Sequence, residues 1–177
     1  MKDQKYTIME RYDELGSSLY DLRYTDEQLE KYSLILHETD YPSLVLDNGC
    51  GTGLLLPFLD NAVGLDLSSV LLRKARERCS ENQYLVQGDS ENLPFRDSLF
   101  DAVISVTVIQ NLPSPELLPA ESARVAKPDS TIIISSLKRV YNREKIMRLI
   151  ENDELCIDKI FTTEKINDWI TLSTRKQ

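Results

Sequence analysis

The sequence holds only 3 cysteines, 1 histidine and 6 glycines among 177 residues. The cysteines are far apart, and neither a CxxC spacing nor a histidine pair accompanies them, which argues against a zinc site or a disulfide framework. Reduced thiols favour a cytoplasmic location. No apolar run approaches the ~20 residues of a membrane-spanning helix, and the start MKDQKYTIMERYDEL is too polar for a signal peptide. We therefore expect neither a metal site nor a membrane segment.

Basic charge is also in the minority, because 21 Lys and Arg stand against 29 Asp and Glu, for a net charge of −8. This balance disfavours a surface that coats nucleic acid, although it leaves room for a local basic patch. The length suits one domain with a substantial core. We expect a single domain over 1–177, with an N-terminal helical cap (1–42), a central core (43–136), and a C-terminal helix and hairpin (137–177).

Short apolar runs alternate with helical patterns along the central core. This β-α alternation predicts a parallel sheet with helices on both faces, an α/β fold. After a helix near 142–151, two alternating runs (155–163 and 168–176) predict a terminal antiparallel hairpin. The expected strands of the core are SLVLD (43–47), NAVGLD (61–66), YLVQGD (84–89), FDAVISVTV (100–108) and TIIISS (131–136).

Helical signals fill the intervals between these strands. In the N-terminal cap, Thr25 and Gln28 form a capping-box pair, and Leu29, Tyr32 and Leu36 share one helical face. We also expect helices in LLLPFL after residue 53, in the segment capped by Ser68, and in PELLPAESARVA before the turn KPDS.

Half of the glycines fall in one stretch, LDNGCGTG (46–53). A strand that runs through a glycine turn into a helix directs backbone N–H groups at a ligand, and glycine permits positive φ and close approach. The dinucleotide pattern GxGxxG is incomplete because Leu54 holds its sixth position, and GK[ST] is missing. The alternative is a tight strand–helix turn that binds nothing.

Three successive strands end in aspartate, at Asp47, Asp66 and Asp89. Each could cap a helix or stabilise a turn. Together they lie at the carboxyl edge of a parallel sheet, where open α/β sheets bind ligands. Asp66 can accept hydrogen bonds from ribose hydroxyls, Asp89 from an adenine amine, and Asp47 suits a cationic amino group. The set therefore fits a nucleoside that carries positive charge and no phosphate.

Five segments in order resemble the signature motifs of class I S-adenosylmethionine-dependent methyltransferases, of the methyltransferase type 11 or UbiE-like kind. The resemblance covers residues 43–136 and implies a Rossmann-like sheet of order 3-2-1-4-5-7-6 with strand 7 antiparallel. It also implies S-adenosylmethionine as cofactor and S-adenosylhomocysteine as product. The segments are VLDNGCGTG, VGLDLS, VQGDSENLPF, FDAVISVTVIQNL and ARVAKPDSTIIIS.

The resemblance also implies roles for particular residues. The glycines would face the methionine part, Asp66 the ribose, Asp89 and Ser90 the adenine, and Ser105 would lie beside the cofactor. The residues that we expect around the cofactor are Asp47, Gly49, Cys50, Gly51, Gly53, Asp66, Leu67, Asp89, Ser90 and Ser105. Two positions depart from the family: Asp129-Ser130 replaces paired glycines in a turn, and Gln110-Asn111 stands where many relatives carry histidine.

The methyl acceptor is less well specified. Gln110, Asn111 and Tyr20 are candidates to face it, with Tyr12 and Tyr24 as further roof residues, although these tyrosines could equally pack on the sheet. The basic segment KRVYNREKIMR (138–148) could face RNA or simply be a solvated helix face. His37 reads as an ordinary helix residue, so a general base is not identified. RNA, in particular transfer RNA, is slightly favoured over a small molecule or a protein side chain.

Other classes and partners remain open. The chain could be a non-catalytic cofactor-binding or scaffold subunit, whereas a nicotinamide-dependent oxidoreductase is disfavoured by the missing glycine. VISVTVIQNL resembles methyltransferases that modify transfer RNA together with a small zinc-binding activator protein. In the implied order the strand 84–89 is a sheet edge with apolar Tyr84, Leu85 and Val86 and without lysine or proline, so the activator could add a strand there. The N-terminal segment could instead cover it.

Overall fold

The computed structural model describes Thr7, Glu10 and residues 25–38 and 44–177. Tyr20, which we expected to roof the acceptor pocket, lies outside these residues, as do Tyr12 and Tyr24. Whether the chain forms one domain over its whole length therefore stays a prediction.

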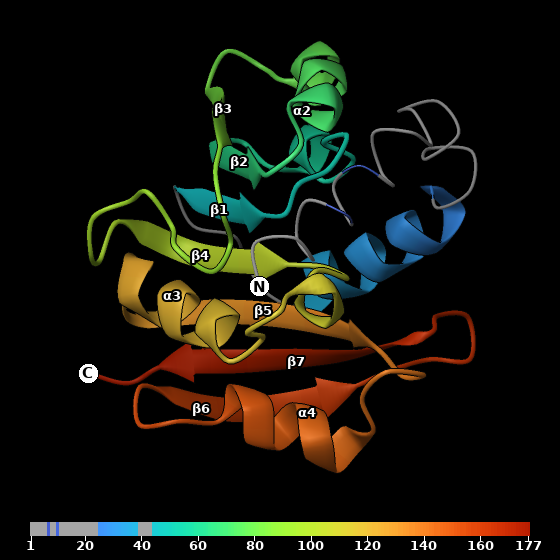
Figure 1. The fold of residues 1–177 in the computed structure, drawn as a ribbon, viewed down its shortest axis with the longest axis vertical. Coiled ribbons are helices and arrows are strands. Elements are labelled where there is room, and N and C mark those ends of the chain that lie inside the picture. The colour runs from blue at the N-terminus through green and yellow to red at the C-terminus, as the bar shows by residue number, and fades with distance from the viewer. Residues whose placement is uncertain (1–6, 8–9, 11–24, 39–43) are drawn as a thin grey trace.

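A seven-stranded sheet of order β3-β2-β1-β4-β5-β7-β6 forms the centre of the molecule (Figure 1). Neighbouring strands from β3 to β5 are parallel, and β7 is antiparallel to both β5 and β6. The predicted fold, including its order and the antiparallel hairpin, is confirmed. The strands are β1 Val45–Asn48, β2 Ala62–Asp66, β3 Gln83–Gln87, β4 Phe100–Ser105, β5 Ala126–Leu137, β6 Leu155–Phe161 and β7 Asp168–Arg175.

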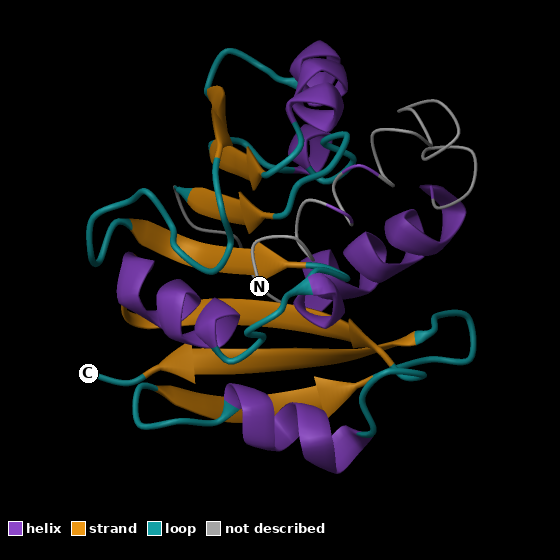
Figure 2. Ribbon diagram, in the orientation of Figure 1, coloured by secondary structure: helices purple, strands orange, loops and turns teal. Residues whose placement is uncertain are grey.

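The central strands are apolar on both faces because both faces are covered. In β4, Val103 packs into one core cluster, whereas Ala102 and Ile104 pack into another. The first cluster holds side chains of α3 (Leu117–Val125) and α4 (Arg143–Ile150), and the second holds Tyr32 and Ile35 of the N-terminal helix (residues 25–38). Figure 2 shows the resulting layers of helix, sheet and helix.

The N-terminal helix is turned differently from the expected stripe. Tyr32 is buried as predicted, but Leu29 is 37% exposed, and Gln28 and Lys31 are buried instead. The reason is electrostatic, since Lys31 forms a buried ion pair with Asp168 at the start of β7. This ion pair turns the helix face that carries residues 28, 31, 32 and 35 toward the sheet.

Several element boundaries also differ from the prediction. The glycine turn leads into one 3-10 turn, η1 (Leu56–Phe58), because Pro57 and the short span before β2 leave no room for a helix. Strand β4 ends at Ser105, and β3 ends at Gln87. The turn expected at KPDS lies inside β5, where Asp129 has a φ of 61°, a backbone conformation that glycine adopts freely.

Ser68 caps α2 (Ser69–Ala75) as expected, since its hydroxyl accepts a hydrogen bond from the Leu71 N–H at 3.1 Å. Within the described residues, no helix has the length and apolar character to cross a membrane. No group of three or more His, Cys, Asp or Glu side chains suited to a metal ion occurs in that part of the chain. The cytoplasmic location stays a prediction.

Candidate functional site

The glycine turn after β1 has the backbone that only glycine adopts easily. Gly49, Gly51 and Gly53 have φ values of 86°, 55° and 75°. Packing adds a second requirement at Gly49, where a Cβ atom would lie 2.3 Å from Cγ2 of Val108. Glycine therefore lets the segment after β4 lie directly on the turn.

Asp66, at the end of β2, fastens this turn. Its Oδ2 accepts a hydrogen bond from the Gly51 N–H at 2.9 Å, and its Oδ1 accepts one from the Ser68 N–H at 2.9 Å. These two bonds use both carboxylate oxygens to hold the backbone of the turn and the start of α2. Asp66 thus shapes the turn, and the ribose contact that we expected of it stays a prediction.

Asp47 and Asn48, at the end of β1, are buried polar residues with unsatisfied atoms. No described residue forms a hydrogen bond with Oδ2 of Asp47, or with Oδ1 or Nδ2 of Asn48. Burial, with a further contribution from the charge of Asp66, raises the pKa of Asp47 to about 7. A cationic group beside Asp47 would offset that cost. The sequence interpretation missed Asn48, although a polar residue next to Asp47 at the end of an apolar strand was the available signal.

Asp89 and Ser90 follow β3 in a tight turn. Oδ1 of Asp89 accepts from the Glu91 N–H at 2.9 Å, and its backbone carbonyl accepts from the Asn92 N–H at 3.0 Å. Ser90 is buried, and the carbonyl of Leu67 accepts a hydrogen bond from Gln87 Nε2 at 3.0 Å. These residues lie after β2 and β3 at the same sheet edge as Asp47.

Two other predicted residues have clear structural contacts. The buried Ser105 hydroxyl donates to the Asn48 carbonyl at 2.8 Å and so links β4 to β1. The Cys50 side chain is buried against Gly64, and burial raises the pKa of its thiol well above the ordinary value. Cys50 is therefore a packed neutral thiol inside the turn.

Thr107 lies between this turn and a neighbouring cavity. Its φ of 63° is rare for a β-branched residue. Its N–H donates to Ser135 Oγ at 2.9 Å, and its carbonyl accepts from the side-chain amides of Gln110 and Asn111. The next residue, Val108, contacts Gly49. Thr107 thereby fixes the segment that separates the two regions.

A buried ion pair holds Thr107 in place. Lys31, which is 2% exposed, lies 2.8 Å from Oδ1 of the fully buried Asp168 and 3.2 Å from Oε1 of Glu27. Its ammonium also donates to Thr107 Oγ1 at 3.0 Å, which in turn donates to Asp168 Oδ2 at 3.0 Å. Ser135 Oγ donates to the same carboxylate oxygen at 2.7 Å. The Lys31 ammonium therefore has one hydrogen bond and two ion-pair contacts, and Oδ1 of Asp168 meets it as an ion pair without a hydrogen bond.

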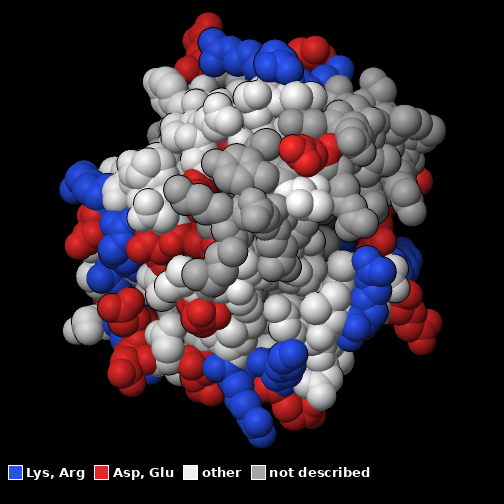
Figure 3. All heavy atoms as spheres, in the orientation of Figure 1, with Lys and Arg blue, Asp and Glu red and all other residues white. Residues whose placement is uncertain are grey.

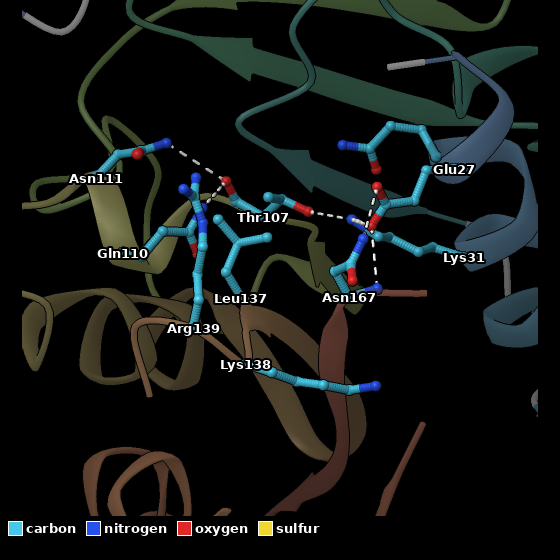
Figure 4. A pocket seen from close by; sticks show the side chains of 10 residues that line it. Glu27, Lys31, Thr107, Gln110, Asn111, Leu137, Lys138, Arg139 and Asn167 are labelled. Carbon is cyan, nitrogen blue, oxygen red and sulfur yellow. Dashed lines mark hydrogen bonds and ion pairs between the residues drawn. The ribbon is translucent and has the colours of Figure 1, made fainter. Parts of the chain in front are cut away.

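A cavity of about 450 Å³ opens beside Thr107 (Figure 4). It joins the N-terminal helix, the 3-10 turn η3 (Ile109–Asn111), the end of β5 and the start of β7. The predicted acceptor-side residues Gln110 and Asn111 both line it. The sequence interpretation did not single out the remaining lining residues for this role: Glu27, Gln28, Lys31, Thr107, Leu137, Lys138, Arg139 and Asn167.

The carboxylate at the cavity wall is Glu27. Burial alone would raise its pKa, but the Asn167 N–H and the charge of Lys31 outweigh burial and lower it. Asn167 donates to Glu27 through its backbone N–H at 3.1 Å. Glu27 is therefore ionised near neutral pH and belongs to the contacts that hold the N-terminal helix on β7.

The basic segment 138–148 does not form one strip. The Lys138 ammonium donates to the carbonyls of Thr163 and Ile166, and that of Lys145 lies 5.0 Å over the Tyr141 ring. Arg148 lines a second cavity beside α3 and α4, whereas Arg139 lines the first. Figure 3 likewise shows Lys and Arg interspersed with Asp and Glu on this face of the molecule.

Comparisons with known proteins identify the family of the chain. A family model described as a methyltransferase domain matches residues 46–134. An uncharacterized protein of Methanocaldococcus jannaschii is 32% identical, with 92% of this chain and 69% of that protein aligned. The demethylmenaquinone methyltransferase of Tropheryma whipplei is 30% identical over 71% of this chain, which spans 59% of that enzyme.

Among solved structures, a similar chain belongs to a complex between the Haloferax volcanii Trm112 methyltransferase activator and a protein named as a methyltransferase. Its TM-score is 0.80 at 17% identity, and the match covers 94% of this chain and 98% of that chain. At this identity the likeness concerns the fold. With the family match, the sheet order and the glycine turn together, the chain belongs to the class I S-adenosylmethionine-dependent methyltransferase family, whose cofactor is S-adenosylmethionine.

Proposed function

We propose that this chain transfers a methyl group from S-adenosylmethionine to an acceptor held in the cavity beside Thr107. The contact between Val108 and Gly49 carries this proposal, because it makes the wall of the cavity continuous with the glycine turn. An acceptor in the cavity and a cofactor on the turn would then be neighbours. Methyl transfer depends mainly on such positioning of the reacting groups.

The roles of the cofactor-side residues follow from their chemistry. Asp47 and Asn48 would hold the amino acid part, Asp66 the ribose, and Asp89 and Ser90 the adenine. The bound cofactor supplies an electrophilic methyl group on a positively charged sulfur. The acidic strand ends suit that positive charge, and the buried orphaned atoms of Asp47 and Asn48 suit a group that brings its own donors and acceptors.

The acceptor side positions its ligand and offers little proton chemistry. Gln110 and Asn111 carry amides, which do not take up a proton near neutral pH. His37 is exposed on the N-terminal helix and does not line the cavity. The proposal therefore favours acceptors that attack without prior deprotonation.

Calorimetry with S-adenosylhomocysteine, and with NAD as the competing ligand, tests the cofactor site. We expect micromolar binding of the former and none of the latter. Gly51→Val should abolish binding because valine strongly disfavours the φ of 55° at this position. Circular dichroism and a melting curve would verify that this variant is folded. A folded variant that binds as well as the parent chain would contradict the assignment.

Incubation with labelled S-adenosylmethionine and fractionated cell extract tests catalysis. Label in a small-molecule, protein or RNA fraction would identify the acceptor class, whereas binding without transfer would favour the non-catalytic scaffold. Transfer RNA stays a prediction, and the scattering of the basic segment weakens its support. If RNA takes up label, reversing the charges of Arg143 and Arg148 should lower the salt dependence of RNA binding by about one unit of slope per phosphate contact.

We further propose that the edge strand β3 binds a small activator protein. Strand β3 is one of the two edge strands of the sheet, and its Tyr84 side chain is 60% exposed. In strand addition, main-chain hydrogen bonds to an edge strand give affinity, and contacts of side chains such as Tyr84 with the partner would give specificity. The fold shared with a chain from an activator complex supports this partner.

Tyr84→Lys is the variant that tests the activator surface, because Leu85 packs into the core and its replacement would also unfold the protein. We expect co-purification with a co-expressed Trm112-type activator to be lost in Tyr84→Lys and kept in the matched exposed variant Val140→Lys. A wild-type chain that retains no activator would contradict the proposal.

A further inference from the structure

We propose that the cavity beside Thr107 binds a small acceptor molecule that carries one carboxylate, which Arg139 recognises, and an N–H group that Gln110 accepts. This inference rests on the proposed function and adds the chemical class of its acceptor. Three observations carry it: an unpaired guanidinium at the cavity, an unsatisfied amide oxygen in its wall, and the charge arrangement around both.

Among the described residues, three cations line the cavity, and Arg139 is the one that has no described partner. The charge of Lys31 is offset by Glu27 and Asp168. The ammonium of Lys138 donates to two backbone carbonyls, and Figure 4 shows it directed away from Gln110. Arg139 instead extends beside Gln110 toward Thr107 in the same view, and no described residue forms an ion pair or hydrogen bond with it.

One free guanidinium favours a carboxylate over a phosphate. A guanidinium binds both oxygens of a carboxylate through two parallel N–H groups. A phosphate carries up to two charges, and the other two cations of the cavity already have partners. The net charge of −8 repels anions from most of the surface, so an unpaired arginine at a cavity would attract an anionic group specifically to that cavity.

Gln110 supplies the second contact. Its Nε2 donates to the Thr107 carbonyl, which fixes the orientation of the amide, so that Oε1 is the free atom. This Oε1 is buried and has no hydrogen-bond partner among the described residues. Gln28, which is 7% exposed and lines the same cavity, also has a buried Oε1 without a partner. A ligand with N–H or O–H donors would satisfy these two buried amide oxygens.

A primary amine can donate an N–H to Gln110 and can also act as the nucleophile that accepts the methyl group. The lone pair of the neutral amine forms the new bond to the methyl carbon while the carbon–sulfur bond breaks, and that electron pair stays on sulfur. The product is a methylammonium, which releases one proton to water at the open side of the cavity. In this arrangement Gln110 would hold the amine N–H and Arg139 the carboxylate.

The test uses the full chain and a matched set of probes. Calorimetry measures binding of para-aminobenzoate, para-aminobenzamide and para-aminophenyl phosphate, each with and without saturating S-adenosylhomocysteine. We expect the carboxylate to bind at least tenfold more tightly than its neutral amide. Arg139→Gln should weaken the carboxylate roughly ten- to a hundredfold and the amide less than twofold. Arg139→Lys should recover only part of this loss.

Arg143→Gln is the matched control, because Arg143 is exposed on α4 and does not line the cavity. It should leave all three affinities unchanged. Equal binding of carboxylate and amide, absence of carboxylate binding, or tighter Arg139-dependent binding of the phosphate would each overturn the proposal. Because S-adenosylhomocysteine binding is measured separately, its failure would contradict the proposed function, whereas carboxylate selectivity remains measurable in the cofactor-free protein.

Discussion

Two buried aspartates at the same edge of the sheet have opposite surroundings. Asp168, at the start of β7, is met by the Lys31 ammonium and by the hydroxyls of Thr107 and Ser135. Asp47, at the end of β1, has an Oδ2 atom that no described residue contacts by a hydrogen bond, and its pKa is raised to about 7. Both aspartates have one oxygen without a hydrogen bond from a described residue, so the difference between them is the Lys31 cation beside Asp168. A buried carboxylate with a cation beside it holds the fold together, whereas one without a cation indicates where a ligand must bring the missing charge.

The same contrast extends to the two halves of the sheet. The acids Asp47, Asp66 and Asp89 lie at or just after the ends of β1, β2 and β3, on the side where the positively charged cofactor is expected. Strands β4, β5 and β7 surround a cavity with Lys31, Lys138 and Arg139 in its wall. A sheet edge that is acidic on one side and basic on the other suits a cationic donor and an anionic acceptor.

The largest expected effect comes from breaking the paired aspartate. Asp168→Ala leaves Lys31 buried without its main partner, which should lower the free energy of unfolding by about 3–5 kcal/mol. Urea denaturation measures this loss. Lys159→Ala removes an exposed ion pair with Glu38 and should cost less than about 1 kcal/mol. The double variant Lys31→Met with Asp168→Leu should regain much of the stability. If Asp168→Ala and Lys159→Ala lower the free energy of unfolding by similar amounts, the buried Lys31–Asp168 pair is no more important for stability than the exposed Lys159–Glu38 pair.

An intermediate effect is expected at Asp66. Asp66→Ala should weaken binding of S-adenosylhomocysteine by roughly 1.5–3 kcal/mol, since it removes charge-assisted hydrogen bonds. Asp66→Asn should lose less, because its amide oxygen can still accept from the Gly51 or Ser68 N–H. Calorimetry gives the affinity and a thermal melt tests the fold. If Asp66→Ala is folded and binds with unchanged affinity, Asp66 serves the turn alone.

The smallest effect is a pH dependence set by the unpaired aspartate. Because the pKa of Asp47 is raised, the folded apo protein holds a proton that the unfolded chain releases at lower pH. The stability that this group contributes is present below about pH 4 and is lost as the pH rises through about 7. A cationic ligand favours the ionised form, so binding at pH 7 should release about half a proton. Below pH 7 the affinity should fall by up to about tenfold per pH unit.

Calorimetry in buffers of different ionisation enthalpy measures the proton release. Asp47→Asn should remove both the release and the pH dependence, and should stabilise the apo protein at alkaline pH relative to the parent chain. A pH-independent affinity in the parent chain would show that Asp47 does not meet a cation.

Local patterns in the sequence were sufficient for the strands of the sheet and for the glycine turn with its neighbouring aspartates, whereas the contacts of these residues with the cofactor stay predictions. Each central strand is a continuous apolar run, and the glycine turn with its neighbouring aspartates is contiguous, so both are legible in a short window. The prediction of a helix after the turn was wrong, because Pro57 and the short connection to β2 allow only one 3-10 turn. Strand order came from the family resemblance, since local periodicity does not encode it.

The acceptor side could not be foreseen because it depends on pairings between distant residues. Glu27 and Asn167 are 140 positions apart, yet they hydrogen-bond in the structure. Lys31 reads as a surface residue in any helical pattern until Asp168 is placed beneath it. Thr107 likewise shows no sign of its left-handed backbone in VISVTVIQNL, because Lys31, Ser135 and Asp168 impose that conformation from other elements.

The attachment of the N-terminal helix to the β6–β7 hairpin has a consequence for the order of folding. Lys31 contacts Asp168, Glu27 contacts Asn167, and Glu38 contacts Lys159, so the helix of residues 25–38 is secured by residues more than 100 positions later in the sequence. During synthesis, the parallel strands up to β4 can pair while the remainder is still on the ribosome. The cavity beside Thr107 has no complete wall until Asn167 has emerged, so the nascent chain completes the glycine turn before this cavity.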